Sequence, residues 1–232
     1  MTRDPSRDEG GSDESLVDPL PGSPLPILDR WLSEARRTDG LRNPDALALA
    51  TVDPRGEPRV RMVLARRFDA DGGSLSFYTN RESPKAREIE LAGRASGVFY
   101  WDGLGRQVRI DGPVERTSDA DSDAYFASRH PRSQIAAWTS AQSRPIESRA
   151  RLLERFEATA ARFGGVDPPD PIPRPPHWGG YRLLAERIEL WVDRPGRLHD
   201  RAVWSREIEP SSGDTGASAT AWSTWQVQRL QP

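Results

Sequence analysis

The chain has 232 residues, a formal net charge of −2 and no cysteine. The absence of thiols excludes disulfides, cysteine catalysis and cysteine-ligated metal, and the near-neutral charge is unlike that of a dedicated nucleic-acid binder. No apolar run approaches the ~20 residues that span a bilayer, and the N-terminal residues lack the apolar core of a signal peptide. We therefore expect a soluble, cytoplasmic protein.

The N-terminal residues 1–24 are rich in Asp, Glu, Ser, Gly and Pro. Such a segment buries too little apolar surface to offset its ordering entropy, so we predict a disordered tail followed by one domain over residues 25–232. A helix is predicted over residues 26–40, ending at Gly40. Its apolar residues at helical spacing are Ile27, Leu28, Trp31, Leu32 and Ala35.

Short apolar runs bounded by turn residues predict most of the remaining chain to be β-structure. The predicted strands are 46–53, 59–69, 74–80, 95–101, 106–117, 187–193, 201–208 and 224–230, and the predicted helices are 83–93, 118–130 and 145–164. The proline-rich residues 166–178 predict a rigid linker, and residues 209–223 a long, flexible hairpin loop. The fold class expected is mainly β with flanking helices, an antiparallel β-barrel.

Several reaction classes lack their sequence motifs. The chain has no glycine-rich phosphate loop, no metal-ligand spacing and no nucleophilic serine motif. What remains is a set of arginines, a lysine and hydroxyls on or beside the predicted strands. The planar fork of arginine binds phosphate in a bidentate manner, although any single arginine is more often simply solvated.

Two clusters point more specifically to phosphate. Tyr125 and Arg129 lie one helical turn apart and Ser133 follows, so the three side chains can converge on one anion. Lys85 lies with Ser83 and Thr79 between a strand and the start of a helix, where an anion is favoured. Spacing of this kind also occurs among ordinary surface residues, so both clusters remain hypotheses at this point.

Several stretches, taken in order, resemble the pyridoxamine 5′-phosphate oxidase family over roughly residues 25–232. They are "RVRMVLARRFD", "FYTNRESPKAREI", "GRQVRIDGPVER", "YFASRHPRSQIAAWTSAQS", "WGGYRLLAERIELW", "RLHDR" and "RLQP". The resemblance implies an FMN-binding split β-barrel that forms a homodimer, with FMN at each subunit interface. It implies no metal, because the flavin supplies the redox chemistry.

The resemblance also implies a role for particular residues. Lys85 would hold the FMN phosphate, and Arg197 and His199 would be catalytic and lie over the reacting carbon of the substrate. The implied flavin contacts are Arg61, Met62, Val63, Leu64, Arg66, Tyr78, Thr79, Lys85, Gln107, Gln142, Ser143, Trp191 and Arg201. The implied substrate contacts are Arg66, Tyr125, Arg129, Ser133, Arg197 and His199.

The implied reaction oxidises pyridoxine 5′-phosphate or pyridoxamine 5′-phosphate to pyridoxal 5′-phosphate. Hydride passes from the substrate C4′ to flavin N5, and oxygen reoxidises the flavin to give hydrogen peroxide. Two residues depart from the family pattern: Arg66 stands where the family usually has lysine, and Pro84 where it usually has arginine. The second departure implies one lost phosphate contact and weaker flavin binding.

Two alternatives remain open. The stretches "ILDRWLSEARR", "ALALATVD" and "SGVFYW" also resemble the flavin oxidase of phenazine biosynthesis, which oxidises a reduced tricyclic carboxylate. That enzyme generally lacks the Tyr, Arg and Ser phosphate grip, so Tyr125, Arg129 and Ser133 favour the phosphorylated vitamin. A non-catalytic binder of flavin or pyridoxal phosphate is the other alternative. The sequence leaves open the choice between alcohol and amine substrates.

Overall fold

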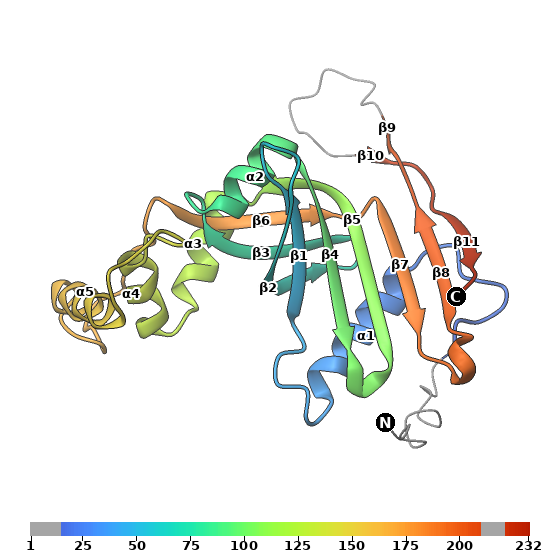
Figure 1. Ribbon diagram of the computed structural model, residues 1–232, viewed down its shortest axis with the longest axis horizontal. Helices are drawn as coiled ribbons and strands as arrows, with labels where there is room; N and C mark the ends of the chain where they lie inside the picture. Colours follow the sequence, from blue (N-terminus) through green and yellow to red (C-terminus); the bar gives the residue numbers. More distant parts are fainter. Residues whose placement is uncertain (1–14, 210–220) are drawn as a thin grey trace.

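The computed structural model describes residues 15–209 and 221–232. Its main element is a nine-stranded antiparallel sheet in the order β11-β8-β7-β5-β4-β1-β2-β3-β6 (Figure 1). The strands are β1 (Ala46–Val52), β2 (Pro58–Asp69), β3 (Ser74–Asn80), β4 (Arg94–Trp101), β5 (Arg106–Arg116), β6 (Trp178–Leu184), β7 (Arg187–Val192), β8 (Asp200–Ser205) and β11 (Gln226–Leu230). A separate pair joins β9 (Ile208–Glu209) to β10 (Ala221–Trp222).

The sheet closes into a barrel because β6 pairs with both β3 and β5. The long strand β5 makes this possible, since its first half pairs with β7 and its second half with β6. Gly112 lies between the two halves, where an added Cβ would approach the Leu184 carbonyl oxygen to 1.9 Å. The predicted antiparallel barrel with flanking helices is confirmed, with β7, β8 and β11 extending from it.

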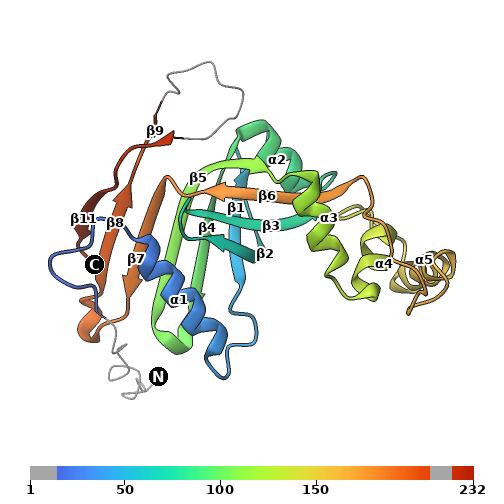
Figure 2. The same cartoon turned by 180° about the vertical axis from the view of Figure 1, so that it is seen from behind.

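The main core fills the barrel and continues beneath helix α1 (Leu25–Arg37), which Figure 2 shows lying across the sheet. Trp31 and Leu28 of α1 are fully buried, as are Leu47, Phe77 and Phe99 of the strands. Alternation of buried and less buried positions along β1 and β4 gives each strand one face toward this core. The barrel therefore provides a rigid frame for its outer loops and helices.

The remaining helices are α2 (Pro84–Ala92), α3 (Asp119–Ala127), α4 (Pro131–Thr139) and α5 (Arg149–Arg162). Helices α3 to α5 gather at the end of the barrel beyond β3 and β6 (Figure 1). They have their own small core, formed by Phe126, Ile135, Ala160, Ile172 and Trp178. The proline-rich stretch contributes to this core, because Ile172 is buried and the Pro173 carbonyl accepts a hydrogen bond from Trp138.

Strand β6 and helix α4 are the longest elements within the described residues that were not predicted; the two-residue strand β10 also lies inside the predicted hairpin loop. Strand β6 begins at the end of the predicted linker, and its Gly179-Gly180 pair is typical of a turn. The glycines are needed because an added Cβ would lie 2.4 Å from the Arg81 guanidinium at Gly179 and 2.5 Å from Thr117 Oγ1 at Gly180. Helix α4 begins at Pro131, three residues after Ser128 caps the end of α3, and His130 Nδ1 accepts a hydrogen bond from the Arg132 amide.

The N-terminal prediction needs a correction for residues 15–24. Leu16 is buried in the main core, and the Pro21 carbonyl accepts a hydrogen bond from the Trp204 indole at 2.8 Å. This segment is packed against the sheet because its few apolar residues find partners there. Residues 1–14, and residues 210–220 of the predicted hairpin loop, lie outside the described residues. Within residues 15–209 and 221–232, no helix is long and apolar enough to cross a membrane.

Candidate active site

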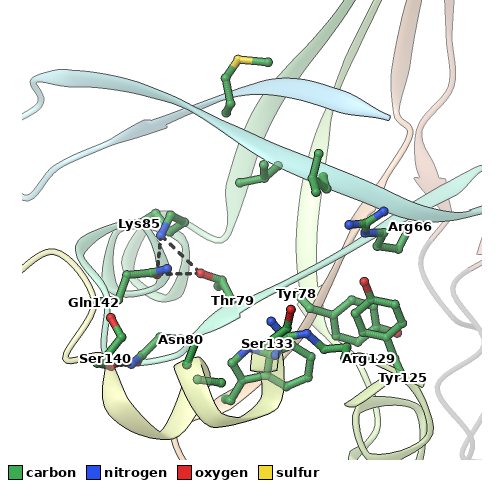
Figure 3. Close-up of a pocket in the computed structure, with 16 residues that line it drawn as sticks. Arg66, Tyr78, Thr79, Asn80, Lys85, Tyr125, Arg129, Ser133, Ser140 and Gln142 are labelled. Carbon is green, nitrogen blue, oxygen red and sulfur yellow. Dashed lines mark hydrogen bonds between the residues drawn. The ribbon is translucent and has the colours of Figure 1, made fainter. Parts of the chain in front are cut away.

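A cavity of about 440 Å³ lies between β2 and β3 of the barrel and the helices α3 and α4 (Figure 3). It brings together many of the predicted site residues. Those that line it are Met62, Val63, Leu64, Arg66, Tyr78, Thr79, Lys85, Tyr125, Arg129, Ser133 and Gln142. Residues far apart in the sequence therefore line one cavity.

One end of the cavity is built around Lys85, in the first turn of α2. Its ammonium donates to Gln142 Oε1 at 2.7 Å and to Thr79 Oγ1 at 3.2 Å (Figure 3). It also donates to Ser83 Oγ at 3.3 Å. All three acceptors are uncharged. Burial, and then the nearby Arg61 guanidinium, lower the pKa of Lys85 to about 8. A desolvated cation at the N-terminal turn of a helix is a favourable position for an anionic ligand.

The other end of the cavity is built around Arg129. Its guanidinium lies over the rings of Trp178 and Phe126, at 4.9 and 5.6 Å from their centroids. Nη1 of Arg129 is buried and has no hydrogen-bond partner among the described residues. Desolvation lowers the pKa of this side chain. A buried donor without a partner is costly, so this group is poised to bind an acceptor from a ligand.

Ser133 and Tyr125 complete this end, as Figure 3 shows. Ser133 lies in the first turn of α4, where its amide donates to the His130 carbonyl at 2.8 Å. The Tyr125 ring stacks on Tyr78 with centroids 4.0 Å apart, and Tyr78 stacks on Trp178 at 5.4 Å. The three rings form an aromatic wall against which a flat ligand can pack.

Arg66 enters the cavity from an irregular point in β2. Ala65 pairs with Phe77 and Arg67 pairs with Ser76, so Arg66 is the extra residue of a β-bulge. A bulge redirects the side chain that it carries, and here it directs Arg66 toward the cavity. Asp45 Oδ2 lies 3.8 Å from its guanidinium, and the positive charge of Arg66 contributes to the lowered pKa of Arg129. Two arginines therefore share this end.

Arg61 and Ser143 do not line this cavity. The Arg61 guanidinium pairs with Glu88 at 2.8 Å and lines a neighbouring hollow that includes Pro84 and Arg87. Ser143 follows Gln142 and has a φ of 66°, one of two positive φ values that non-glycine residues adopt within the described part of the chain. The other is Arg197, with a φ of 62°. Strain of this kind persists where the surroundings fix an unusual side-chain direction.

A second cluster of predicted residues lies at the junction of β7 and β8. The His199 ring is 4.6 Å from the Trp191 ring, and its Nδ1 is 3.0 Å from Asp193 Oδ1. Arg201 is held by Glu189 Oε1 at 2.7 Å and by the Gln231 carbonyl at 2.9 Å. Arg197 is exposed in the preceding turn. None of these residues lines the 440 Å³ cavity.

The strand register places this second cluster on the same sheet face as Met62 of the cavity. Gln107 pairs with Trp191, which pairs with Arg201. Arg109 lies two residues after Gln107 in β5 and therefore on the same face of the sheet. Arg109 pairs with Val98, Val98 with Ala48, and Ala48 with Met62, so Met62 also lies on this face. Strands β1, β4 and β5 separate β2 from β7, which corresponds to about 19 Å across the sheet. One chain therefore carries two separate halves of the predicted site.

The cavity also contains residues that the sequence analysis missed. They are Asn80, Ala136, Ala137, Ser140 and Trp178. The spacing of Ser133, Ala136, Ala137 and Ser140 is that of one helix face, which would have identified them had helix α4 been predicted. Trp178 was assigned to the linker, and its position beside Arg129 depends on β6. No group of three or more potential metal ligands lies together in residues 15–209 and 221–232.

The fold and the cavity define a β-barrel protein with a cavity lined by cationic and aromatic side chains. Comparison with known sequences specifies the family. A family model described as pyridoxamine 5′-phosphate oxidase matches residues 34–163, and one described as the pyridoxine 5′-phosphate oxidase C-terminal dimerisation region matches residues 178–232. The chain belongs to the pyridoxamine 5′-phosphate oxidase family.

Individual relatives agree with this assignment. The chain is 50% identical over 184 residues to the pyridoxine/pyridoxamine 5′-phosphate oxidase of Azorhizobium caulinodans, covering 79% of this chain and 84% of that protein. It is 49% identical over 209 residues to the oxidase of the same name from Brucella canis, covering 90% and 94%. The crystal structure of PhzG from Burkholderia lata 383, in complex with tetrahydrophenazine-1-carboxylic acid, has a TM-score of 0.78 at 30% identity, covering 96% of this chain and all of that chain.

Proposed function

We propose that this chain is an FMN-dependent oxidase that converts pyridoxine 5′-phosphate or pyridoxamine 5′-phosphate to pyridoxal 5′-phosphate, with O2 as electron acceptor and H2O2 as product. One observation carries the proposal: a single cavity has a desolvated cation at each end, Lys85 at one and Arg129 at the other. Two phosphorylated molecules, a cofactor and a substrate, would match the two ends. The relatives with 49–50% identity support the same reaction.

The residues around Lys85 fit the phosphate of FMN. Within the described residues, Lys85 has hydrogen bonds to uncharged acceptors and no ion pair, so its charge is available to an anion. Gln142 and Thr79 would keep the ammonium in place, and the apolar residues Met62, Val63 and Leu64 would border the flavin ring. When bound, the flavin would accept a hydride from the substrate and pass the electrons to O2.

The residues around Arg129 fit the phosphate of the substrate. The buried Nη1 of Arg129 would donate to a phosphate oxygen, together with the hydroxyls of Tyr125 and Ser133. Arg66 would add a second positive charge at this end. The aromatic wall of Tyr78, Tyr125 and Trp178 would exclude water beside the phosphate. Together these contacts would orient the substrate ring for oxidation.

The catalytic pair Arg197 and His199 would come from a second copy of the chain. Both halves of the site lie on one sheet face, which also exposes the apolar side chains of Val60 (72%), Met62 (61%) and Tyr100 (58%). A two-fold dimer through this face would bring the β7–β8 cluster of one protomer to the cavity of the other. Contact with Asp193 through Nδ1 would leave Nε2 of His199 free to face the substrate. The dimerisation region at residues 178–232 supports this arrangement.

A shared site can be tested by complementation. Arg129→Ala and Arg197→Ala would each be inactive alone, whereas a heterodimer of the two would contain one site with both arginines. Coexpression should therefore restore about a quarter of the wild-type activity. No recovery in isolated heterodimers would show that each chain uses its own Arg197.

The phenazine-type reaction is the second candidate, and it is favoured by the likeness to PhzG at 30% identity. The lining of the cavity favours the phosphorylated substrates instead, because Tyr125, Arg129 and Ser133 lie together at the end where we propose that the substrate phosphate binds. The direct test is oxygen consumption by the FMN-loaded protein with three substrates: pyridoxine 5′-phosphate, pyridoxamine 5′-phosphate and tetrahydrophenazine-1-carboxylic acid. We expect turnover of the phosphorylated substrates. Turnover of the phenazine alone would reverse the assignment, and tight flavin binding without any turnover would indicate a non-catalytic binder.

A further inference from the structure

Glu88 of α2 is a buried carboxylate, 6% exposed, that lines the hollow beside Arg61 and not the 440 Å³ cavity. The Thr51 hydroxyl of β1 donates to its Oε2 at 2.5 Å, and the Arg61 guanidinium of β2 donates to the same oxygen at 2.8 Å. Arg61 also donates to the Thr51 hydroxyl, and to the Leu49 carbonyl at 3.4 Å. This closed set of hydrogen bonds fixes the Arg61 guanidinium against α2.

The carboxylate also lies one helical turn after Lys85. Two charged groups act on the Lys85 ammonium: Arg61 of β2 lowers its pKa and Glu88 of α2 raises it. The other side chains in contact with the ammonium, Thr79, Ser83 and Gln142, are uncharged. Arg61 and Lys85 are thus two cations close enough to repel each other, and Glu88 offsets that repulsion.

We propose that Glu88 is a positioning residue for the phosphate of the cofactor. It holds Arg61 beside Lys85, so that both cations act on one phosphate group. This inference rests on the proposed use of FMN. It also bears on Pro84, which lines the neighbouring hollow together with Arg61 and Glu88 and contributes no cation of its own. With a proline at that position, the orientation of Arg61 carries more of the phosphate binding.

Substitutions at Glu88 separate positioning from charge. Glu88→Ala removes both the hydrogen bonds and the charge, so Arg61 loses its anchor and FMN should bind about tenfold more weakly at pH 6.5. Glu88→Gln keeps an oxygen that accepts from Arg61, so the affinity at pH 6.5 should stay within about threefold of wild type. Loss of the negative charge should nevertheless lower the pKa of Lys85. The pH above which FMN affinity declines should therefore fall by about one unit in Glu88→Gln.

The measurement is the dissociation constant of FMN, obtained from the change in flavin fluorescence between pH 6 and pH 10. The matched control is Glu90→Gln, two residues along α2, whose carboxylate pairs with Arg116 and Tyr181 and not with Lys85 or Arg61. The control should keep the wild-type affinity and pH profile. A general disturbance of α2 would instead shift the control as much as the Glu88 variants, and would overturn the proposal.

The outcomes also separate this inference from the proposed function. If the wild-type protein binds FMN and all three variants follow its pH profile, Glu88 has no positioning role and the proposed oxidase remains. If the wild-type protein does not bind FMN at any pH, the proposed function fails and this inference fails with it. Thermal unfolding of each apoprotein identifies the folded variants, and the Glu88→Gln profile decides the question if Glu88→Ala does not fold.

Discussion

Replacing Arg129 by alanine should separate substrate binding from stability. The guanidinium has no ion pair among the described residues, its Nη1 has no partner, and burial lowers its pKa. Its removal therefore eliminates a desolvated charge and costs two cation–π contacts, with Trp178 and Phe126. Removal of the desolvated charge stabilises the folded state, whereas loss of the cation–π contacts destabilises it. We therefore expect the free energy of unfolding to change by less than about 1 kcal/mol.

Substrate binding should respond very differently to the same change. Two charge-assisted hydrogen bonds from Arg129 to the substrate phosphate would contribute about 3 kcal/mol together, which corresponds to a loss of about 150-fold in kcat/KM for pyridoxine 5′-phosphate. Arg129→Lys retains the charge but loses the fork, so we expect an intermediate loss of about tenfold. Arg132→Ala is the control, because Arg132 packs over Phe156 and does not line the cavity.

The assay is steady-state formation of pyridoxal 5′-phosphate by the FMN-loaded variants, with urea unfolding of the same preparations. The reasoning would be refuted if kcat/KM of Arg129→Ala stayed within threefold of wild type. It would also be refuted if Arg132→Ala lost as much activity as Arg129→Ala, since the effect would then not depend on the cavity.

Three further predictions follow from individual contacts. Gly180→Ala should weaken substrate binding, because the new Cβ would lie 2.6 Å from the Tyr78 ring and displace it; Gly22→Ala, with nothing within 4 Å, should leave KM unchanged. Arg206→Ala should lower the free energy of unfolding by about 3 kcal/mol in a urea titration, because the buried guanidinium contacts the rings of Trp222 and Trp225 and donates to two carbonyls. The control Arg182→Ala, at an exposed arginine, should lower it by less than about 0.5 kcal/mol, and equal losses would contradict this account. FMN affinity should be constant between about pH 7 and pH 8, above the range where the FMN phosphate takes up a proton, and should decline as pH rises through about 8 because Lys85 loses its proton there. A flat profile up to about pH 9.5 would show that the charge of Lys85 is not used.

The elements that were predicted correctly have local patterns that match their packing. Helix α1 presents Leu28, Trp31 and Leu32 at helical spacing, and all three are buried. Most strands carry β-branched and aromatic residues between turn signals. The predicted disorder up to residue 24 was too extensive, because the contacts of Leu16 and Pro21 are made with strands almost two hundred residues away. Such long-range contacts cannot be predicted from the composition of the segment.

The elements that were missed depend on their neighbours. Gly179 and Gly180 are typical of a turn, yet they form part of β6 because Arg81, Tyr78 and Thr117 occupy the space above them. Without β6 the barrel does not close and Trp178 has no place beside Arg129. The bulge at Arg66 is another case, since it is a property of the β2–β3 pairing and not of either strand alone.

The candidate site could be predicted only in part for a similar reason. The resemblance named residues from both ends of the cavity, and the structure brings most of them together. The structure also shows that Trp191, His199 and Arg201 lie across the sheet from the cavity. This distance depends on the strand order and could not be predicted from the positions of the residues in the sequence. The ion pair of Arg61 with the buried Glu88 likewise depends on the packing of α2 against β1 and β2, which the sequence does not show.

The most direct test of the proposed oxidase is anaerobic. The purified protein would be loaded with FMN, mixed with pyridoxine 5′-phosphate in the absence of oxygen, and followed through the visible absorbance of the flavin. The account predicts that the flavin band bleaches, that it recovers when air is admitted, and that Arg129→Ala bleaches only at much higher substrate concentration. Firmly bound flavin that stays oxidised with pyridoxine 5′-phosphate and pyridoxamine 5′-phosphate, but bleaches with tetrahydrophenazine-1-carboxylic acid, would contradict it.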